Sequence, residues 1–243
     1  MKVFNYKLEE KLVPLGDLHA GANNFKKEKF KETIKKIKKI NASVILMGDL
    51  IENATRTSVG SGVYEQDLNP GEQIEDICKK LDPIKDNILL GVSGNHENRT
   101  FKQSGLDISK IIMDYLECDY TPYMAMARLK NKYINYDVFA WHGASGASTI
   151  AGKLRPLMEK STWVDADLYL QGHVHELYHV TDTKRIVVKN EFESRLKHFV
   201  LTGSYLGYDD SYAEMKGYRP AKIGSPLITF DLKKHHIGVD LEW

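Results

Sequence analysis

Residues 43–49 read SVILMGD, a short apolar run that stops at a glycine and an aspartate. A run of this length and composition predicts a buried strand over residues 43–47. Similar apolar runs, each followed by a polar loop residue, occur at residues 12–15, 87–92, 133–141 and 167–170. Amphipathic segments at residues 25–40, 71–81 and 107–116 are expected to be helices. Strands that alternate with helices predict an α/β protein.

The loops that follow these five strands carry side chains that bind metals. Ligands in open α/β sheets lie beyond the carboxyl ends of the strands. Residues i and i+2 at an extended strand end point to the same side, so Asp17 and His19 should converge. Imidazole nitrogen with carboxylate or amide oxygen suits a first-row divalent cation. We therefore predict a site for two cations about 3.5–4 Å apart, with the ligands Asp17, His19, Asp49, Asn95, His142, His173 and His175.

The ordered motifs D-x-H (17–19), G-D (48–49), G-N-H-E (94–97), H (142) and G-H-x-H (172–175) resemble the signature of the calcineurin-like metallophosphoesterases. The resemblance covers about two-thirds of the chain and extends, less closely, to members carried by bacteria and their viruses. We expect a two-sheet α/β/β/α sandwich of mixed β-sheets flanked by helices, forming a single domain over residues 1–243. The family activity implied is hydrolysis of a phosphoester by in-line attack of metal-bound hydroxide.

The resemblance also implies a role for each motif residue. One cation would be held by Asp17, His19 and His175, the other by Asn95, His142 and His173, with Asp49 bridging them. His96 would be the general acid that protonates the leaving oxygen. In some branches of the family an acid three residues after the bridging aspartate orients this histidine, and that position is Glu52 here.

One departure from the family bears on the substrate. Protein serine/threonine phosphatases follow the motif of the bridging aspartate with Asp-Arg-Gly, whose arginine contacts phosphate, whereas residues 49–53 here read DLIEN and contain no arginine. This difference argues against a protein phosphatase. Arg99 is a candidate for the phosphate contact, because a guanidinium matches phosphate geometry. The equal alternative is that Arg99 is a surface arginine on a loop and has no role in the site.

We rank hydrolysis of a phosphodiester, in nucleic acid or a nucleotide, first. A phosphomonoesterase acting on a small metabolite, or a nucleic-acid-binding accessory subunit with secondary hydrolysis, are the alternatives. Eight lysines in residues 26–39 form either a solvated helix face or a surface that follows phosphates. Residues 56–70 are a candidate lid. The tyrosines of residues 203–220 either pack that segment onto the sheet or stack on bases: Tyr205, Tyr208, Tyr212 and Tyr218.

The overall composition gives little information about binding partners. The net charge of +1 does not indicate a nucleic-acid or a membrane partner. No apolar run is long enough for a membrane span or a secretory signal, and Cys78 and Cys118 are expected to be reduced thiols, so we expect a cytoplasmic protein. Manganese is the expected metal, with iron or zinc as alternatives.

Strands are expected at residues 177–188 and 196–201, and those at 226–230 and 237–241 should close a second sheet. The other histidines receive no role: His179, His198, His235 and His236.

Overall fold

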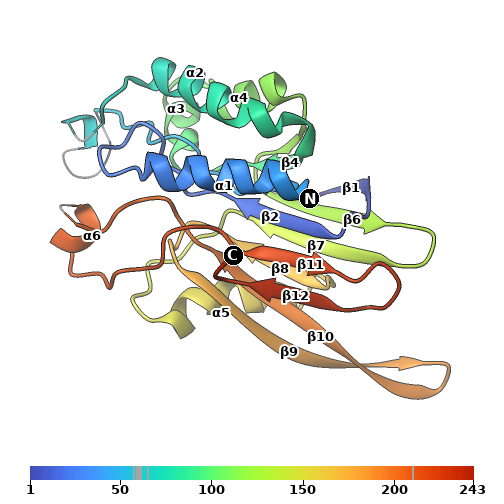
Figure 1. Cartoon of the computed structure of the whole chain (residues 1–243). Helices are drawn as coiled ribbons and strands as arrows, with labels where there is room; N and C mark the ends of the chain where they lie inside the picture. Colours follow the sequence, from blue (N-terminus) through green and yellow to red (C-terminus); the bar gives the residue numbers. More distant parts are fainter. Residues whose placement is uncertain (57, 59–61, 65, 210) are drawn as a thin grey trace.

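The computed structural model describes residues 1–56, 58, 62–64, 66–209 and 211–243. In this part of the chain two six-stranded mixed sheets pack face to face, with helices on both outer faces (Figure 1). This arrangement confirms the predicted α/β/β/α sandwich.

The first sheet has the strand order β12-β11-β2-β3-β4-β5. Strands β2, β3, β4 and the edge strand β5 run parallel, and β11 lies antiparallel to β2. The bounds are Lys11–Leu15 for β2, Ser43–Leu46 for β3, Ile88–Val92 for β4, Asp119–Thr121 for β5, Leu227–Phe230 for β11 and Ile237–Asp240 for β12.

The second sheet has the order β1-β6-β7-β8-β10-β9. β6 and β7 form an antiparallel hairpin, as do β9 and β10, while β7, β8 and β10 run parallel. The bounds are Lys2–Lys7 for β1, Met124–Lys130 for β6, Asn135–Trp141 for β7, Leu168–Gln171 for β8, Leu177–Val188 for β9 and Glu191–Thr202 for β10. The C-terminal strands are therefore divided between the two sheets and do not close a second sheet by themselves.

Three apolar clusters separate the layers. Val13, Leu15, Val44 and Leu46 face the helices above the first sheet, whereas Leu12, Ile45 and Met47 point into the space between the sheets. This alternation is the period of two expected of a strand that is buried on both faces. A third cluster joins the second sheet to the helix beneath it.

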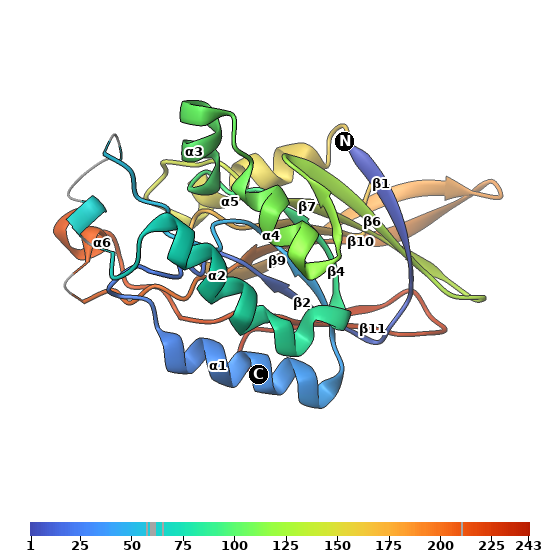
Figure 2. The ribbon, with the colours of Figure 1, turned by 90° about the horizontal axis from the view of Figure 1, so that it is seen from above.

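Helices α1 (Lys27–Ile40), α2 (Pro70–Leu81) and α4 (Ile108–Leu116) cover the first sheet, and α5 (Ile150–Lys160) covers the second (Figures 1 and 2). The shorter helical segments are η1 (Gly62–Tyr64), η2 (Asp82–Asn87), α3 (Glu97–Ser104) and α6 (Tyr212–Met215). No helix among the described residues is long and apolar enough to cross a membrane.

Several boundaries differ from the sequence-based expectations. Phe25 precedes α1 and forms an isolated bridge with Leu206, because the chain first pairs with the C-terminal segment. Asn41 does not lie on the buried face of α1; it is exposed and caps the helix in a left-handed conformation with φ 51°.

The two cysteines do not form a disulfide. Cys78 is buried and Cys118 half-buried, and both are free thiols.

Candidate metal centre

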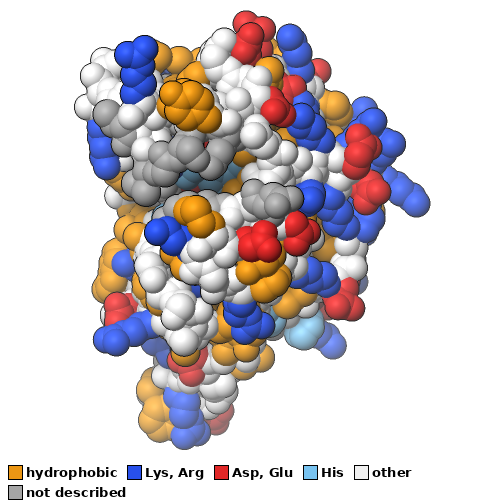
Figure 3. Space-filling view, turned by 90° about the vertical axis from the view of Figure 1, so that its left-hand side faces the viewer, with side chains coloured by type: hydrophobic (Ala, Val, Ile, Leu, Met, Phe, Trp, Pro, Cys, Tyr) orange, Lys and Arg blue, Asp and Glu red, His pale blue; other side chains and the backbone are white. Residues whose placement is uncertain are grey.

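The predicted ligands follow five strands whose carboxyl ends meet at one edge of the sandwich. β2, β3 and β4 of the first sheet deliver residues 17–19, 49 and 95–96, while β7 and β8 of the second deliver residues 142 and 173–175. Figure 3 views the molecule from this end and shows histidine side chains at the bottom of a recess. The two sheets thus contribute the two walls of one site.

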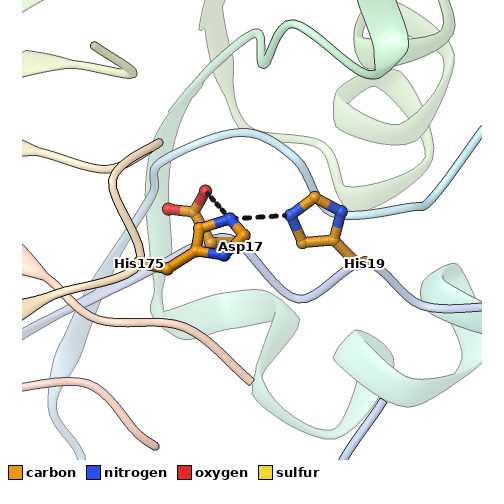
Figure 4. A group of neighbouring side chains, drawn as sticks. All are labelled: Asp17, His19 and His175. Carbon is orange, nitrogen blue, oxygen red and sulfur yellow. Dashed lines mark hydrogen bonds and ion pairs between the residues drawn. The ribbon is translucent and has the colours of Figure 1, made fainter. Parts of the chain in front are cut away.

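The first group consists of Asp17, His19 and His175 (Figure 4). The two imidazoles approach with Nε2 atoms 3.1 Å apart, and Nε2 of His175 lies 3.4 Å from Oδ1 of Asp17. Asp17 is fully buried and His19 is 2 % exposed, whereas the side chain of His175 is 36 % exposed. One side of this group is therefore open to solvent.

The second group consists of Asp49, His142 and His173, to which Asn95 adds an amide oxygen. Oδ1 of Asn95 lies 3.0 Å from Nε2 of His142 and 2.7 Å from Nδ1 of His173. The carbonyl of Met47 accepts a hydrogen bond of 2.7 Å from Nδ1 of His142, which leaves Nε2 free to act as a ligand.

Asp49 lies between the two groups. Its Oδ2 atom is 3.3 Å from Nε2 of His142 and 3.8 Å from Nε2 of His19. Its other oxygen accepts a hydrogen bond of 2.8 Å from the backbone N–H of His96. One carboxylate oxygen thus faces both groups. The donor set of imidazole, carboxylate and amide fits two first-row divalent cations.

A cluster of three residues lies beside Asp49: His96, Glu52 and Arg99. Nδ1 of His96 donates to the backbone carbonyl of Glu52 at 2.7 Å, and the Glu52 carboxylate lies 3.4 Å away. That carboxylate also contacts Nδ1 of His19 at 2.9 Å. Glu52 therefore contacts both the candidate acid and a candidate ligand.

Arg99 contacts the other ring nitrogen of His96. Its Nη2 lies 2.8 Å from Nε2 of His96, and its Nη1 donates to the carbonyl of Glu52 at 3.1 Å. A guanidinium only donates, so this hydrogen bond exists only while Nε2 of His96 is unprotonated. Protonation of Nε2 requires Arg99 to move away. The side chain of Arg99 is 26 % exposed, so a substrate phosphate could reach it from solvent.

A known protein family matches the part of the chain that carries the candidate ligands. The sequence profile of the calcineurin-like phosphoesterase family matches residues 11–177. The chain belongs to this family. It matches no curated protein sequence at a significant level.

Solved structures similar to this calcineurin-like phosphoesterase share little sequence with it. They include the phosphoesterase YfcE from E. coli, with 15 % identity over 93 % of this chain and 96 % of that chain and a TM-score of 0.45. Vps29 from Entamoeba histolytica, complexed with Zn²⁺, has 15 % identity over 96 % and 99 % of the two chains and a TM-score of 0.45. A predicted phosphoesterase from Streptococcus pneumoniae has 12 % identity over 95 % and 88 %, with a TM-score of 0.40.

The backbone of the phosphoesterase is strained at the candidate ligands. Five of them have φ between 48° and 67°, in the left-handed region that side chains with a Cβ atom disfavour: Asp17, His19, Asp49, His173 and His175. Gly48, which precedes Asp49, also has a positive φ, of 82°. Strain of this kind concentrates at functional sites.

Glu97 is a residue of this site to which the sequence analysis gave no role. It is 1 % exposed, and its carboxylate accepts hydrogen bonds from the backbone N–H groups of Asp49, Leu50, Ile51 and Gly94. Burial, and then the charge of Asp49, raise the pKa of Glu97. The only sequence signal was its place in the G-N-H-E motif. The carboxylate joins the loops after β3 and β4 and so holds Asp49 in place.

The carboxylates of the site control the charge of its histidines. Burial opposes protonation of His96, but Asp49 and Glu52 outweigh it and raise the pKa of His96 to about 9. Burial is likewise outweighed at His142, where Asp49 raises the pKa to about 10. The pKa of His19 is lowered, by burial and by His96. The negative charge that produces the raised values is the charge that would attract cations.

The two candidate substrate segments have different outcomes. The predicted lid over residues 56–70 includes residues 57, 59–61 and 65, which lie outside the described residues. Tyr205 is fully buried and packs edge-on against Phe30 at 5.5 Å between ring centroids, so it is a core residue and not a platform for bases. Tyr208 is half-buried and Tyr218 is 51 % exposed.

Proposed function

We propose that this phosphoesterase is a dinuclear metal-dependent phosphodiesterase, with manganese as its metal. The observation that supports this proposal is the position of Asp49, whose Oδ2 atom faces His142 of one ligand group and His19 of the other. A shared carboxylate between two sets of nitrogen and oxygen ligands suits a pair of cations. Cations bound there would act as Lewis acids on a phosphoryl group and lower the pKa of a water molecule.

The chain's own residues would complete the chemistry. His96 is placed to give a proton to the leaving oxygen, because its ring lies beside Asp49 and its Nδ1 is fixed by the Glu52 carbonyl. Arg99 would bind the incoming phosphate. If the guanidinium moves from Nε2 of His96 to the phosphate, the same movement frees that nitrogen to carry a proton.

Two observations favour a diester over a monoester. Residues 50–53, which follow the bridging aspartate, contain no arginine, so fewer positive groups are available for a dianionic monoester. It also carries a strongly basic helix beside the metal centre. The substrate we favour is therefore a phosphodiester of nucleic acid or a nucleotide.

The direct test compares hydrolysis of bis-p-nitrophenyl phosphate with that of p-nitrophenyl phosphate in manganese. We expect preferential cleavage of the diester by the wild type. The variant Asp49→Asn should bind less metal and lose this activity, because the oxygen that faces both groups would lose its charge. Preferential cleavage of the monoester would replace the proposal by a phosphomonoesterase, and equal activity of Asp49→Asn would remove the metal centre from the mechanism.

The role of His96 has its own test. His96→Ala should keep its metal but lose about 10²- to 10⁴-fold in turnover on a dinucleotide, whose leaving alkoxide needs a proton. Its loss on bis-p-nitrophenyl phosphate should be smaller, because nitrophenolate leaves without a proton. His236→Ala, at an exposed position, is the matched control. Equal losses on the two substrates would contradict the assignment of His96 as an acid.

A further inference from the structure

The positive charge of this chain is concentrated on one helix. Residues 26–39 contain eight lysines and two glutamates, which gives this segment a formal charge of +6, whereas the whole chain has +1. The remaining residues therefore carry a formal charge of −5. The chain is therefore nearly neutral as a whole although this one segment is strongly basic.

The lysines of α1 point away from the protein. Phe30, Ile34 and Ile37 are buried against the first sheet, and the opposite face carries what we call the α1 lysine face, the exposed residues Lys27, Lys31, Lys35, Lys36, Lys38 and Lys39. In Figure 3 lysine and arginine side chains gather along the right-hand side of the view, the side on which α1 lies. The face is available to a partner along the whole helix, about 21 Å at 1.5 Å per residue.

Few of these charges are neutralised. Lys27 lies 3.3 Å from Asp67 and Lys31 lies 3.9 Å from Glu28. In the part of the chain that the structure describes, no carboxylate lies within 4.0 Å of the Nζ atoms of Lys35, Lys38 or Lys39. Exposed lysines without acidic partners are suited to an external polyanion.

The start of α1 is linked to the metal centre through one residue, Tyr205. The helix begins at the edge of the sandwich where the ligands lie (Figure 1). The backbone N–H of Lys26 donates to the carbonyl of Tyr205, and the N–H of Tyr205 donates to the carbonyl of Asp17. The first turn of α1 is thus held against the loop that carries two candidate ligands.

We propose that the α1 lysine face binds the phosphate backbone of a single-stranded nucleic acid and guides it into the metal centre. This inference rests on the proposed phosphodiesterase function and names its substrate as a polymer. Lysines four residues apart are separated by a rise of about 6 Å along the helix, so the face can contact several successive phosphates of a flexible strand. Clustered lysines gain affinity by releasing the counterions of a nucleic acid.

A single strand fits better than a duplex or a membrane. Asp17, Asp49 and His142 are at most 4 % exposed, so a phosphate must enter a recess, which a flexible strand can do and a rigid duplex cannot. An interfacial membrane helix inserts an exposed apolar face into the lipid. The apolar residues of α1 are instead buried in the core, which leaves only charge on its outer face.

The test measures binding of a labelled oligothymidylate by fluorescence anisotropy across a range of salt concentrations. All proteins carry Asp49→Asn to prevent cleavage. The test variant is Lys31→Gln/Lys35→Gln/Lys38→Gln/Lys39→Gln. The control removes the same charge from exposed lysines at the opposite end of the sheets, at the end of β6 and in the β6–β7 and β11–β12 turns: Lys130→Gln/Lys132→Gln/Lys233→Gln/Lys234→Gln.

We expect the test variant to bind at least about tenfold more weakly near 0.1 M salt, with a log–log salt slope smaller by about 3, since each phosphate contact contributes about 0.7. The control variant should differ little from the parent. Hydrolysis of bis-p-nitrophenyl phosphate should be unchanged when the four α1 substitutions are made in a chain with Asp49 intact, because that substrate reaches only the metal centre.

Other results would overturn the inference. These are no binding by the parent, equal effects of the two quadruple variants, tighter binding to a duplex of the same length, or preferential binding to phosphatidylserine vesicles. Binding is measured without turnover. The inference can therefore fail while the small diester is cleaved, and it can survive if that diester is not.

Discussion

Replacing Glu97 with glutamine should destabilise the metal-free protein although the side chain keeps its size. Oε1 of Glu97 accepts from the N–H groups of Leu50 at 2.6 Å and Ile51 at 3.2 Å, and Oε2 accepts from those of Asp49 and Gly94, both at 3.1 Å. Glutamine keeps one oxygen. Its amide nitrogen is a donor, so two buried N–H groups would lose their acceptor and face another donor.

The size of this effect follows from the two lost acceptors. Each buried unsatisfied donor costs about 1–3 kcal/mol, so the loss is about 2–6 kcal/mol. For a chain of this length 1 kcal/mol lowers Tm by about 2–4 °C, and we therefore expect a decrease of at least about 4 °C. Metal affinity should decrease about 10- to 100-fold, because Asp49 is no longer held between the two ligand groups.

Thermal unfolding in a chelator and calorimetric titration with manganese measure these two effects. The matched control is Glu75→Gln, which removes an exposed carboxylate 3.7 Å from Lys79 and should change Tm by less than about 2 °C. If Glu97→Gln shifts Tm no more than Glu75→Gln does, the four backbone hydrogen bonds do not stabilise the loop and the reasoning is wrong.

Two other substitutions test the electrostatics and the strain. Burial, with the positive charges of His179 and His236, lowers the pKa of His198 to about 4, below its value of about 6.5 in the unfolded chain. The stability that this histidine contributes is complete above pH about 6.5 and is lost as pH falls to about 4, by up to about 3 kcal/mol. His198→Gln should flatten the urea-unfolding free energy over this window, whereas Lys102→Gln, at an exposed position, should not; parallel profiles of the His198→Gln variant and the wild type would contradict the assignment. At position 175, where φ is 54°, metal-free His175→Gly should unfold about 2–4 °C above His175→Ala, because only glycine relieves about 1 kcal/mol of strain. An alanine variant as stable as the glycine variant would show that the backbone there is unstrained.

The apolar runs predicted an α/β protein and the assembly of the site, because both depend on where these runs end, whereas the two-sheet sandwich was expected from the family resemblance. The carboxyl ends of parallel strands share an edge, so Asp17, Asp49 and Asn95 meet although many residues separate them. The core strands were visible for the same reason. β3 is buried on both faces and therefore reads as a continuous apolar run.

Other elements gave a weaker signal. β6 consists of MAMARLK, whose alanine and methionine side chains do not favour strands. α5 contains Gly152 and Pro156, which are unfavourable inside a helix. The role of Glu97 depends on hydrogen bonds to residues 46 to 48 positions away, and no local pattern encodes such bonds. The sequence left open whether Tyr205 packs its segment onto the sheet or stacks on bases, because that segment has no periodicity; the side chain is fully buried.

The left-handed ligands have a consequence for how this sequence can change over generations. At five ligand positions the backbone favours glycine, while the chemistry requires a carboxylate or an imidazole. A copy of the chain that no longer needed its metals would gain stability from substitutions at those positions, so they should be among the first to drift. Retention of aspartate and histidine at left-handed positions would therefore indicate selection for metal binding. Among relatives of this chain, glycine at those positions would mark the lineages that have given up the metals.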